Sequence, residues 1–401
     1  MNKKRKQILS LFRYGLADHE AMANTYPHVL LKLSETLDVH HFSFKSLHKH
    51  WLTEHEHIYI HEMPIRLKRS SAFDKWSKTI LWYITAPWIG LWARAKKIDL
   101  IYIEESLPIL PLILMFFSGR PVAISSCDIL WDVYLGHKKW EKPIRQFFEK
   151  MDVFTWKRLQ GTITHTEAYK QYAVSKGIKA DNIAVISEAC ESHIFYPIDK
   201  QSAREQFGFH DHDFVIVHHG ILHPNKALDR IFSFVQPLLD QHKSILFVIA
   251  GDGPLRLKLE IQAKKLDMEK HVQFLGWLPH VNALNDLLNA GDVSLVMREG
   301  KFSDHFQVTA NLLHSLACGS SILAARLKGI SEWVKDGKNG LLFDPTDRDE
   351  FCNQLIRMLD HPENRKQMGI EAYKTVQEKL DPKKITQQWA HALYSFFPVE
   401  K

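Results

Sequence analysis

The clearest pattern in the sequence is an alternation of short apolar runs with longer polar segments between residues 213 and 344. The apolar runs are Phe214–His218, Ile245–Ala250, Val272–Leu275 and Val293–Met297. Runs of this length are typical of buried strands, and the segments between them have the length of crossover helices. The alternation predicts an α/β domain built on a parallel sheet.

A weaker form of the same alternation extends from the N-terminus to residue 197. Its apolar runs are Gln7–Phe12, Val39–Phe44, Ile58–Ile60, Ile98–Ile103, Pro121–Ser125, Gln160–Thr164 and Ile183–Ile186. We therefore expect two α/β domains, residues 1–197 and 198–378, with the linker in the polar segment Pro197–Asp213. Residues 379–401 form a predicted C-terminal helix, because apolar residues recur there at intervals of three to four.

Glycines follow most of the predicted strands of the second domain, among them Gly220, Gly251 and Gly253. Ligands of open parallel sheets bind at the carboxyl ends of the strands. Glycine permits close approach of a ligand to the backbone, as well as positive φ angles. Tight turns without any ligand are the alternative interpretation.

The segment 73–97 is unusually rich in aromatic and cationic residues. It contains Trp76, Trp82, Tyr83, Trp88 and Trp92, bracketed by Lys75, Lys78, Arg94, Lys96 and Lys97. We expect Pro87 to begin a second helical piece, with Trp88 and Trp92 on one face. One hypothesis is peripheral contact with an anionic membrane surface. The other is that the aromatic side chains pack on the protein's own sheet.

Composition narrows the class of protein. The 401 residues are 45% hydrophobic and 24% charged, as in soluble proteins, with a net charge of +6. The four cysteines are widely spaced, which argues against a zinc site or a disulfide framework and suits a cytoplasmic protein. Lys3–Lys6 precedes only five apolar residues, too few for a signal-peptide core. No apolar stretch has the length of a membrane span.

Six short motifs occur in an order that resembles the nucleotide-sugar-binding half of the retaining family-four glycosyltransferases (glycosyl transferases group 1). They are Gly220–Lys226, Ala250–Pro254, Val272–Gly276, Ala290–Val293, Leu316–Gly319 and Gly329–Leu342. The resemblance implies the GT-B architecture, in which two Rossmann-like domains face each other across a cleft and the C-terminal helix crosses back to the first domain. The first domain would then take the acceptor and the second the donor.

The resemblance also implies an activity and a set of site residues. A sugar would be transferred with retention from a UDP- or GDP-sugar to a glycan or lipid-linked acceptor, with no metal required. Lys226 matches a lysine that offsets the charge of the leaving diphosphate, and Asp128 could orient a sugar or acceptor hydroxyl. The remaining candidate binding residues are Gly15, Gly220, Gly251, Gly253, Thr309, Ala310, Asn311, His314 and Glu332.

One part of this site follows from helix physics. Gln307–Asn311 is predicted to open a helix with Thr309 as its N-cap. The backbone N–H groups of such a helix start would face the diphosphate. The plain alternative for Lys226 is a surface lysine at a helix start, and the plain alternative for Thr309 is capping without a ligand.

Four positions depart from the family pattern. Ile221 replaces an arginine, Cys127 a histidine, and Phe306 and His314 two glutamates. We expect that His219 or His223 could stand in for the arginine, and Asp304 or Glu299 for a glutamate.

Two rival functions stay open. One is a catalytically degenerate, glycosyltransferase-like binding subunit. The other is a nucleotide-sugar epimerase on the same fold, although no acidic and histidine set typical of one is present. We expect a cytoplasmic location, with the alternative of contact at the inner face of the membrane, and no nucleic-acid partner.

Overall fold

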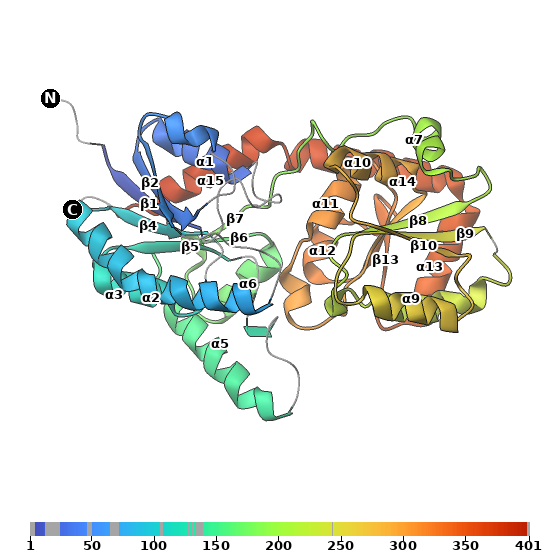
Figure 1. The fold of residues 1–401 in the computed structure, drawn as a ribbon, viewed down its shortest axis with the longest axis horizontal. Helices are drawn as coiled ribbons and strands as arrows, with labels where there is room; N and C mark the ends of the chain where they lie inside the picture. The colour runs from blue at the N-terminus through green and yellow to red at the C-terminus, as the bar shows by residue number, and fades with distance from the viewer. Residues whose placement is uncertain are drawn as a thin grey trace. The chain divides into compact units, whose positions relative to one another are not determined.

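The computed structural model describes residues 5–12, 25–45, 50–64, 72–104, 107–126, 129, 131–132, 139–242 and 244–398. The chain forms two compact units, which are Met1–Ala189 with Pro382–Lys401 and Cys190–Asp381. Each unit holds one parallel sheet with helices on its faces (Figure 1). The predicted α/β fold with two Rossmann-like halves is confirmed.

The first sheet has seven strands in the order β3-β2-β1-β4-β5-β6-β7. They are β1 (Gln7–Leu11), β2 (Asp38–Phe44), β3 (Ile58–Met63), β4 (Leu100–Ile103), β5 (Val122–Ser126), β6 (Gly161–Thr164) and β7 (Ile183–Val185). Most of these strands are buried on both faces, which explains their nearly continuous apolar sequences. All seven predicted runs form strands.

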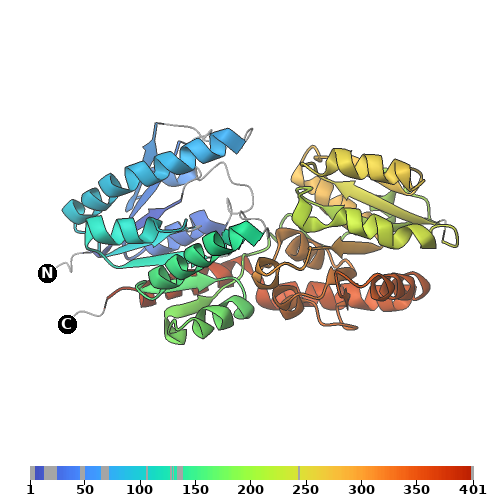
Figure 2. The same cartoon turned by 90° about the horizontal axis from the view of Figure 1, so that it is seen from below.

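Helices cover both faces of this sheet. Because the crossovers are right-handed, connections that run in opposite directions across the sheet place their helices on opposite faces. One face carries α1 (Thr25–Ser34) and α15 (Pro382–Ser395). The opposite face carries α2 (Ala72–Lys96), α3 (Leu110–Ser118), α5 (Lys142–Trp156) and α6 (Glu167–Ser175), which lie in front of the sheet in Figure 2.

The C-terminal helix returns to the first unit, as expected. Trp389 of α15 is fully buried there, and its Nε1 donates to the Tyr102 hydroxyl at 3.0 Å. A Cβ on Gly161 would lie 2.1 Å from the Phe396 ring, so glycine lets the end of this segment pack directly on β6.

One expectation for the segment 73–97 is wrong. Helix α2 runs without interruption through Pro87, instead of starting again there. Trp88 is 72% exposed, whereas Trp92 packs edge-on against the rings of His40, Phe42 and His61. Trp82 is buried against Phe44. Trp82 and Trp92 therefore pack against strand residues of the sheet, whereas Trp88 is exposed to solvent.

The second sheet has six parallel strands in the order β10-β9-β8-β11-β12-β13. They are β8 (Phe214–His219), β9 (Ile245–Ala250), β10 (Val272–Gly276), β11 (Val293–Val296), β12 (Ile322–Ala325) and β13 (Gly340–Phe343). The helices are α7 (Lys200–Phe207), α8 (Leu228–Val235), α9 (Arg256–Lys265), α10 (Val281–Ala290), α11 (Ala310–Ala317), α12 (Lys328–Trp333), α13 (Arg348–Asp360) and α14 (Pro362–Lys379).

The units divide at Ala189/Cys190 and Asp381/Pro382, rather than at residues 197/198 and 378/379. Cys190 and Phe195 are buried in the core of the second unit, so this stretch packs with the second sheet before the polar segment begins.

None of the helices in the described parts of the chain is both long enough and apolar enough to cross a bilayer.

Candidate functional site

The strand order of the second sheet reverses between β8 and β11. From β8 the chain proceeds outward through β9 and β10, and from β11 it proceeds the other way through β12 and β13. Ligands of open α/β sheets bind at the carboxyl ends of the strands where such a reversal occurs. The loop after β8 and the loop after β11 meet at this edge. With α11, which follows the second loop, they carry six of the eleven predicted site residues.

Lys226 is the last residue of η4 (Pro224–Lys226), a short 3-10 turn after β8, and its side chain is partly exposed. Burial, and after it the positive charge of Lys226, lowers the pKa of His218 to about 4. The ammonium group therefore lies close to the end of β8. The turn is held by the loop after β11, because the Glu299 N–H donates to the Asn225 carbonyl at 2.9 Å.

Helix α11 begins at the same edge. Thr309 occupies its N-cap position, but its side chain makes no capping hydrogen bond and instead donates to the Asn311 Oδ1. The predicted capping interaction is therefore wrong, although the predicted helix start is right. The first N–H groups of a helix have no acceptor within the helix, and the Thr309 hydroxyl does not serve as one here.

The end of β8 and α11 are joined by two histidines. The His219 Nε2 and His314 Nδ1 lie 3.4 Å apart in a hydrogen bond, and the His314 ring stacks on Phe195 with centroids 4.0 Å apart. Burial lowers the pKa of His314 to about 4. Burial and the neighbouring His314 hold the pKa of His219 well below its usual value.

Both imidazoles are consequently neutral near pH 7. The expectation that His219 replaces the missing cation beside Ile221 is wrong, because burial removes its charge. His223 is exposed, and its Nδ1 accepts the Asn225 N–H at the start of η4.

The glycines bring two loops together. Gly251 has φ +135°, and a Cβ there would lie 2.0 Å from the Gly220 carbonyl oxygen. A Cβ on Gly253 would lie 2.7 Å from the Leu222 carbonyl oxygen. The loops after β8 and β9 are also linked by a hydrogen bond from the Leu222 N–H to the Asp252 carbonyl, at 3.0 Å. Close loop packing alone therefore requires glycine at 251 and 253, and their role in nucleotide binding stays a prediction.

The acidic residues expected to substitute for Phe306 have other partners. Asp304 is buried, forms an ion pair with Arg298 at 3.4 Å, and accepts the N–H groups of Gly300 and Lys301. Asp304 thus holds the loop before α11 in shape and does not reach a sugar, so this expectation is wrong. Glu299 pairs with Lys301 at 2.6 Å and is partly exposed.

Phe306 is 5% exposed and packs edge-on against Phe302, at a centroid distance of 5.0 Å. It belongs to η6 (Ser303–Phe306), the turn that α12 contacts. Glu332, the candidate for the base or ribose, is partly exposed in α12. The loop 297–309 thus has an apolar side chain where the family pattern has a carboxylate.

In the first unit, Gly15, Cys127 and Asp128 lie outside the described residues.

The strand order of the first sheet reverses between β1 and β4, and a buried polar network that we did not predict from the sequence lies there. The Tyr102 hydroxyl donates to Glu104, which directly follows β4. Ser10 bonds to the Tyr26 hydroxyl and, at 2.9 Å, to the His41 Nδ1.

The sequence signal for this network was the presence of Ser10 and His41 within strands that are otherwise mostly apolar. These residues and Tyr102 are register partners on β1, β2 and β4, so their side chains leave one face of the sheet. Burial lowers the pKa of His41 to about 3.

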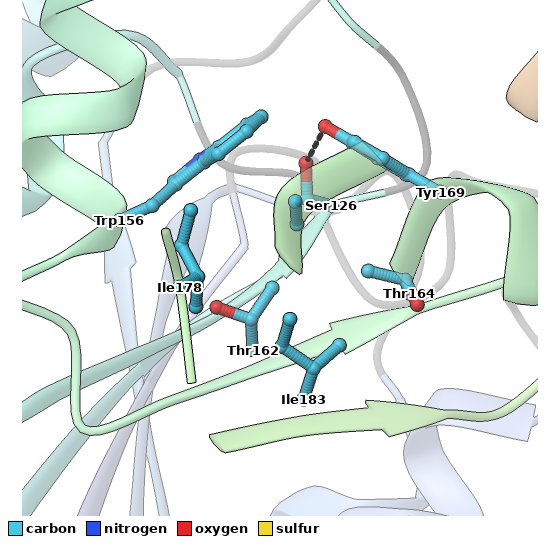
Figure 3. Close-up of a pocket in the computed structure, with 8 residues that line it drawn as sticks. Ser126, Trp156, Thr162, Thr164, Tyr169, Ile178 and Ile183 are labelled. Atoms are coloured by element: carbon cyan, nitrogen blue, oxygen red, sulfur yellow. Dashed lines mark hydrogen bonds between the residues drawn. The ribbon is translucent and has the colours of Figure 1, made fainter. Parts of the chain in front are cut away.

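A small pocket lies at the end of β5 (Figure 3). The Ser126 hydroxyl bonds to the Tyr169 hydroxyl at 2.8 Å across it. None of the residues that line it is charged. His165, which directly follows β6, is buried, and its Nδ1 lies 3.9 Å from the Glu188 carboxylate.

Comparison with known proteins agrees with this fold. Residues 199–375 match the family model described as Glycosyl transferases group 1. The putative glycosyltransferase EpsD of Bacillus subtilis is 29% identical over 181 residues, which are 45% of each chain. The D-inositol 3-phosphate glycosyltransferase of Acidothermus cellulolyticus is 29% identical over 55% of this chain and 49% of its own. The chain thus spans about half the length of these curated relatives.

Solved structures match over nearly the whole chain. Anabaena HepE in complex with UDP-glucose is 19% identical with a TM-score of 0.72, covering 97% of this chain and 99% of its own. Sucrose-phosphate synthase from Thermosynechococcus elongatus is 16% identical with a TM-score of 0.75, covering 98% and 99%. These structures share the two-unit α/β fold of this chain, and the match to the family model covers residues 199–375.

Replacing Gly251 by alanine should destabilise the second unit by about 3 kcal/mol or more, because the new methyl group overlaps a backbone oxygen. The matched control is Gly208→Ala, where φ is also positive but no atom lies within 4 Å of the new Cβ. That change should cost about 1 kcal/mol. Thermal unfolding followed by circular dichroism measures both, and equal losses would contradict the loop packing described here.

Acid should destabilise the protein partly through His314. Its folded-state pKa of about 4 lies below the ordinary 6.5, so its contribution is complete above pH 6.5 and is lost as the pH falls towards 4. The loss by pH 4 is on the order of 3 kcal/mol. His314→Gln should flatten the pH dependence of unfolding by about one proton, and the exposed His212→Gln serves as control. An unchanged slope in His314→Gln would show that His314 titrates normally.

Proposed function

We propose that this protein transfers a sugar, with retention of configuration, from a nucleotide-diphosphate sugar to a glycan or lipid-linked acceptor. The observation that carries the proposal is that Lys226 follows β8 and α11 follows β11, the two paired strands at which the strand order of the second sheet reverses. A departing nucleoside diphosphate gains negative charge, and these two groups are suited to offset it.

The two groups act in different ways. Lys226 brings a full positive charge on a flexible side chain, whose ammonium group can follow the phosphate as the bond to the sugar breaks. The N–H groups at the start of α11 have fixed directions and the positive end of the helix dipole behind them. Together they can balance a diphosphate without a metal ion, so we propose a metal-independent reaction.

The ligands and substrates named for similar proteins suggest which compounds to test first. Crystal structures of Anabaena HepE contain UDP, UDP with glucose, and UDP-glucose. Curated relatives include a phosphatidylinositol N-acetylglucosaminyltransferase subunit of yeast, 27% identical over 46% of this chain. UDP-sugars are therefore the first donors to examine, and inositol-containing lipids are reasonable first acceptors.

The rival function is a binding subunit without transferase activity. The burial of Phe306 and the stacking of His314 on Phe195 favour it, because the family pattern has glutamates at both positions. Phenylalanine cannot bond to a sugar hydroxyl, and a buried neutral imidazole can do so only weakly. A Phe306→Glu exchange would not discriminate, since it would bury a carboxylate against Phe302.

A thermal-shift panel of UDP- and GDP-sugars tests the proposal, since a ligand that binds only the folded protein raises its melting temperature. The sugar that binds is then incubated with candidate acceptors, with and without EDTA, and the anomeric configuration of the product is read by NMR. Transfer with retention in the presence of EDTA supports the proposal. Binding without transfer favours the rival. No binding by any nucleotide sugar contradicts the proposal and also favours the rival.

Lys226→Ala should weaken nucleoside diphosphate binding about ten- to a hundredfold, because it removes a charged partner of the phosphate. Isothermal titration calorimetry with UDP or GDP measures the change. Lys265→Ala, at an exposed position in the last turn of α9, is the matched control and should bind as the wild type does. Equal affinities of the two variants would remove Lys226 from the site.

A further inference from the structure

Large apolar side chains are exposed in unusual number on the outer helices of the first unit. Nine of the twenty exposed large apolar residues in the described part of the chain lie on α2, on α3, or on α5 with the 3-10 turn η2 (Lys139–Glu141) that leads into it. They are Ile80, Ile84, Trp88, Leu91, Phe116, Trp140, Ile144, Phe147 and Phe154. Single exposed apolar residues are ordinary, but a concentration of them marks an interaction surface.

Helix α5 shows the most one-sided arrangement. Trp140, Ile144, Phe147 and Phe154 recur at intervals of four, three and seven residues, so they follow one side of the helix. Trp140 is 64% exposed and Phe147 56%. Within α5, the buried residues are Thr155 and Trp156, both in its last turn. The rest of the helix extends away from the sheet (Figure 1).

The pair α2 and α3 shows a second apolar face. Ile80, Ile84, Trp88 and Leu91 lie on one side of α2, and Phe116 of α3 is 80% exposed. The two helices are closely packed, because a Cβ on Gly90 would lie 2.8 Å from the Phe117 Cβ. Both this pair and α5 cover the same side of the sheet, as Figure 2 shows.

The charges around these apolar side chains have one sign. Among the described side chains of α2, α3, η2 and α5 and the residues directly after them, every exposed charged side chain is cationic. They are Arg94, Lys96, Lys97, Lys142, Lys150, Lys157 and Arg158. The acids of η2 and α5, Glu141, Glu149 and Asp152, are half-buried. Glu149 pairs with Lys176 at 2.5 Å, and burial raises the pKa of Asp152 to about 7.

We propose that this side of the first unit, formed by residues 80–97, Phe116 and residues 140–158, docks on an anionic lipid bilayer. Apolar and aromatic side chains rimmed by lysine and arginine fit the boundary between headgroups and acyl chains. A bilayer is also a continuous plane, so it can receive two separate apolar faces on one side of a unit. The surface is wider than the segment 73–97 expected from the sequence.

The docking surface would give the transferase access to lipid-linked acceptors, and in this respect the inference rests on the proposed function. Lipid binding itself requires no nucleotide sugar. A failure to bind vesicles would therefore leave the thermal-shift and transfer results unaffected, and the absence of transfer would leave the docking surface intact.

Sedimentation of the full chain with vesicles tests the proposal, using phosphatidylcholine alone and phosphatidylcholine mixed with phosphatidylglycerol. We expect binding to the mixed vesicles only, weakening as salt is added. The double variant W140S/F147S should lower the partition coefficient at least about tenfold. The variant K150Q/K157Q should lower it about fivefold for each charge removed.

The control is L257S/I261S on α9 of the second unit, where the two residues are 68% and 59% exposed but lie outside the proposed surface. It should bind vesicles as the wild type does, and circular dichroism should show that all variants remain folded. Wild-type binding by both W140S/F147S and K150Q/K157Q would overturn the proposal. So would a self-associated wild type that W140S/F147S converts to monomer in the absence of lipid, because the face would then bind a second copy of this chain.

Discussion

The pairing of β8 with β11 is the constraint on which the candidate site depends. Val293 is in register with Ile216 although 77 residues separate them in the chain, and this one parallel pairing reverses the strand order of the second sheet. Parallel strands share an edge at which all their carboxyl ends emerge. Lys226, which follows β8, and α11, which follows β11, consequently reach the same edge. The His219–His314 hydrogen bond ties the two elements together there.

The side chains at this edge that differ from the family pattern pack against other side chains of the protein. His314 stacks on Phe195, and Phe306 packs on Phe302. Asp304, a candidate replacement for one of the missing glutamates, is bonded to Arg298 and to two backbone N–H groups. A buried carboxylate needs such partners, because desolvation of an unpaired charge is costly. The diphosphate contacts that we propose at this edge are therefore a lysine and a helix start, and the two glutamate positions of the family pattern hold Phe306 and His314.

The two faces of the first sheet differ in the side chains that their covering elements bury or expose. One face carries the Ser10–Tyr26–His41 cluster and the Tyr102–Glu104 pair, sealed by Trp389 of the returning helix. The helices on the other face leave aromatic side chains in water, which is unfavourable for an isolated domain. Such exposure is expected where another surface covers these side chains during function. The cations around them favour an anionic lipid surface, as proposed above.

Sequence alone determined the strands and the fold class. Central strands of parallel sheets are buried on both faces, so continuous apolar runs such as Ile245–Ala250 identify them to within a residue or two. It did not predict α5, because the apolar residues of this helix are largely exposed and its buried contacts are confined to one end. Nor did it separate Trp88 from Trp92, since the contacts of Trp92 come from β2 and β3.

The tertiary structure decided the charges and partners at the candidate site. Whether a histidine is a cation depends on burial among residues that lie far away in the chain, as for His219 beneath α11. Whether Asp304 can reach a ligand depends on Arg298 and on the turn between them. The local sequence shows the spacing of apolar residues that burial requires in each helix or strand. The desolvation of a titratable side chain and its pairing with a partner depend on contacts between elements that are far apart in the chain.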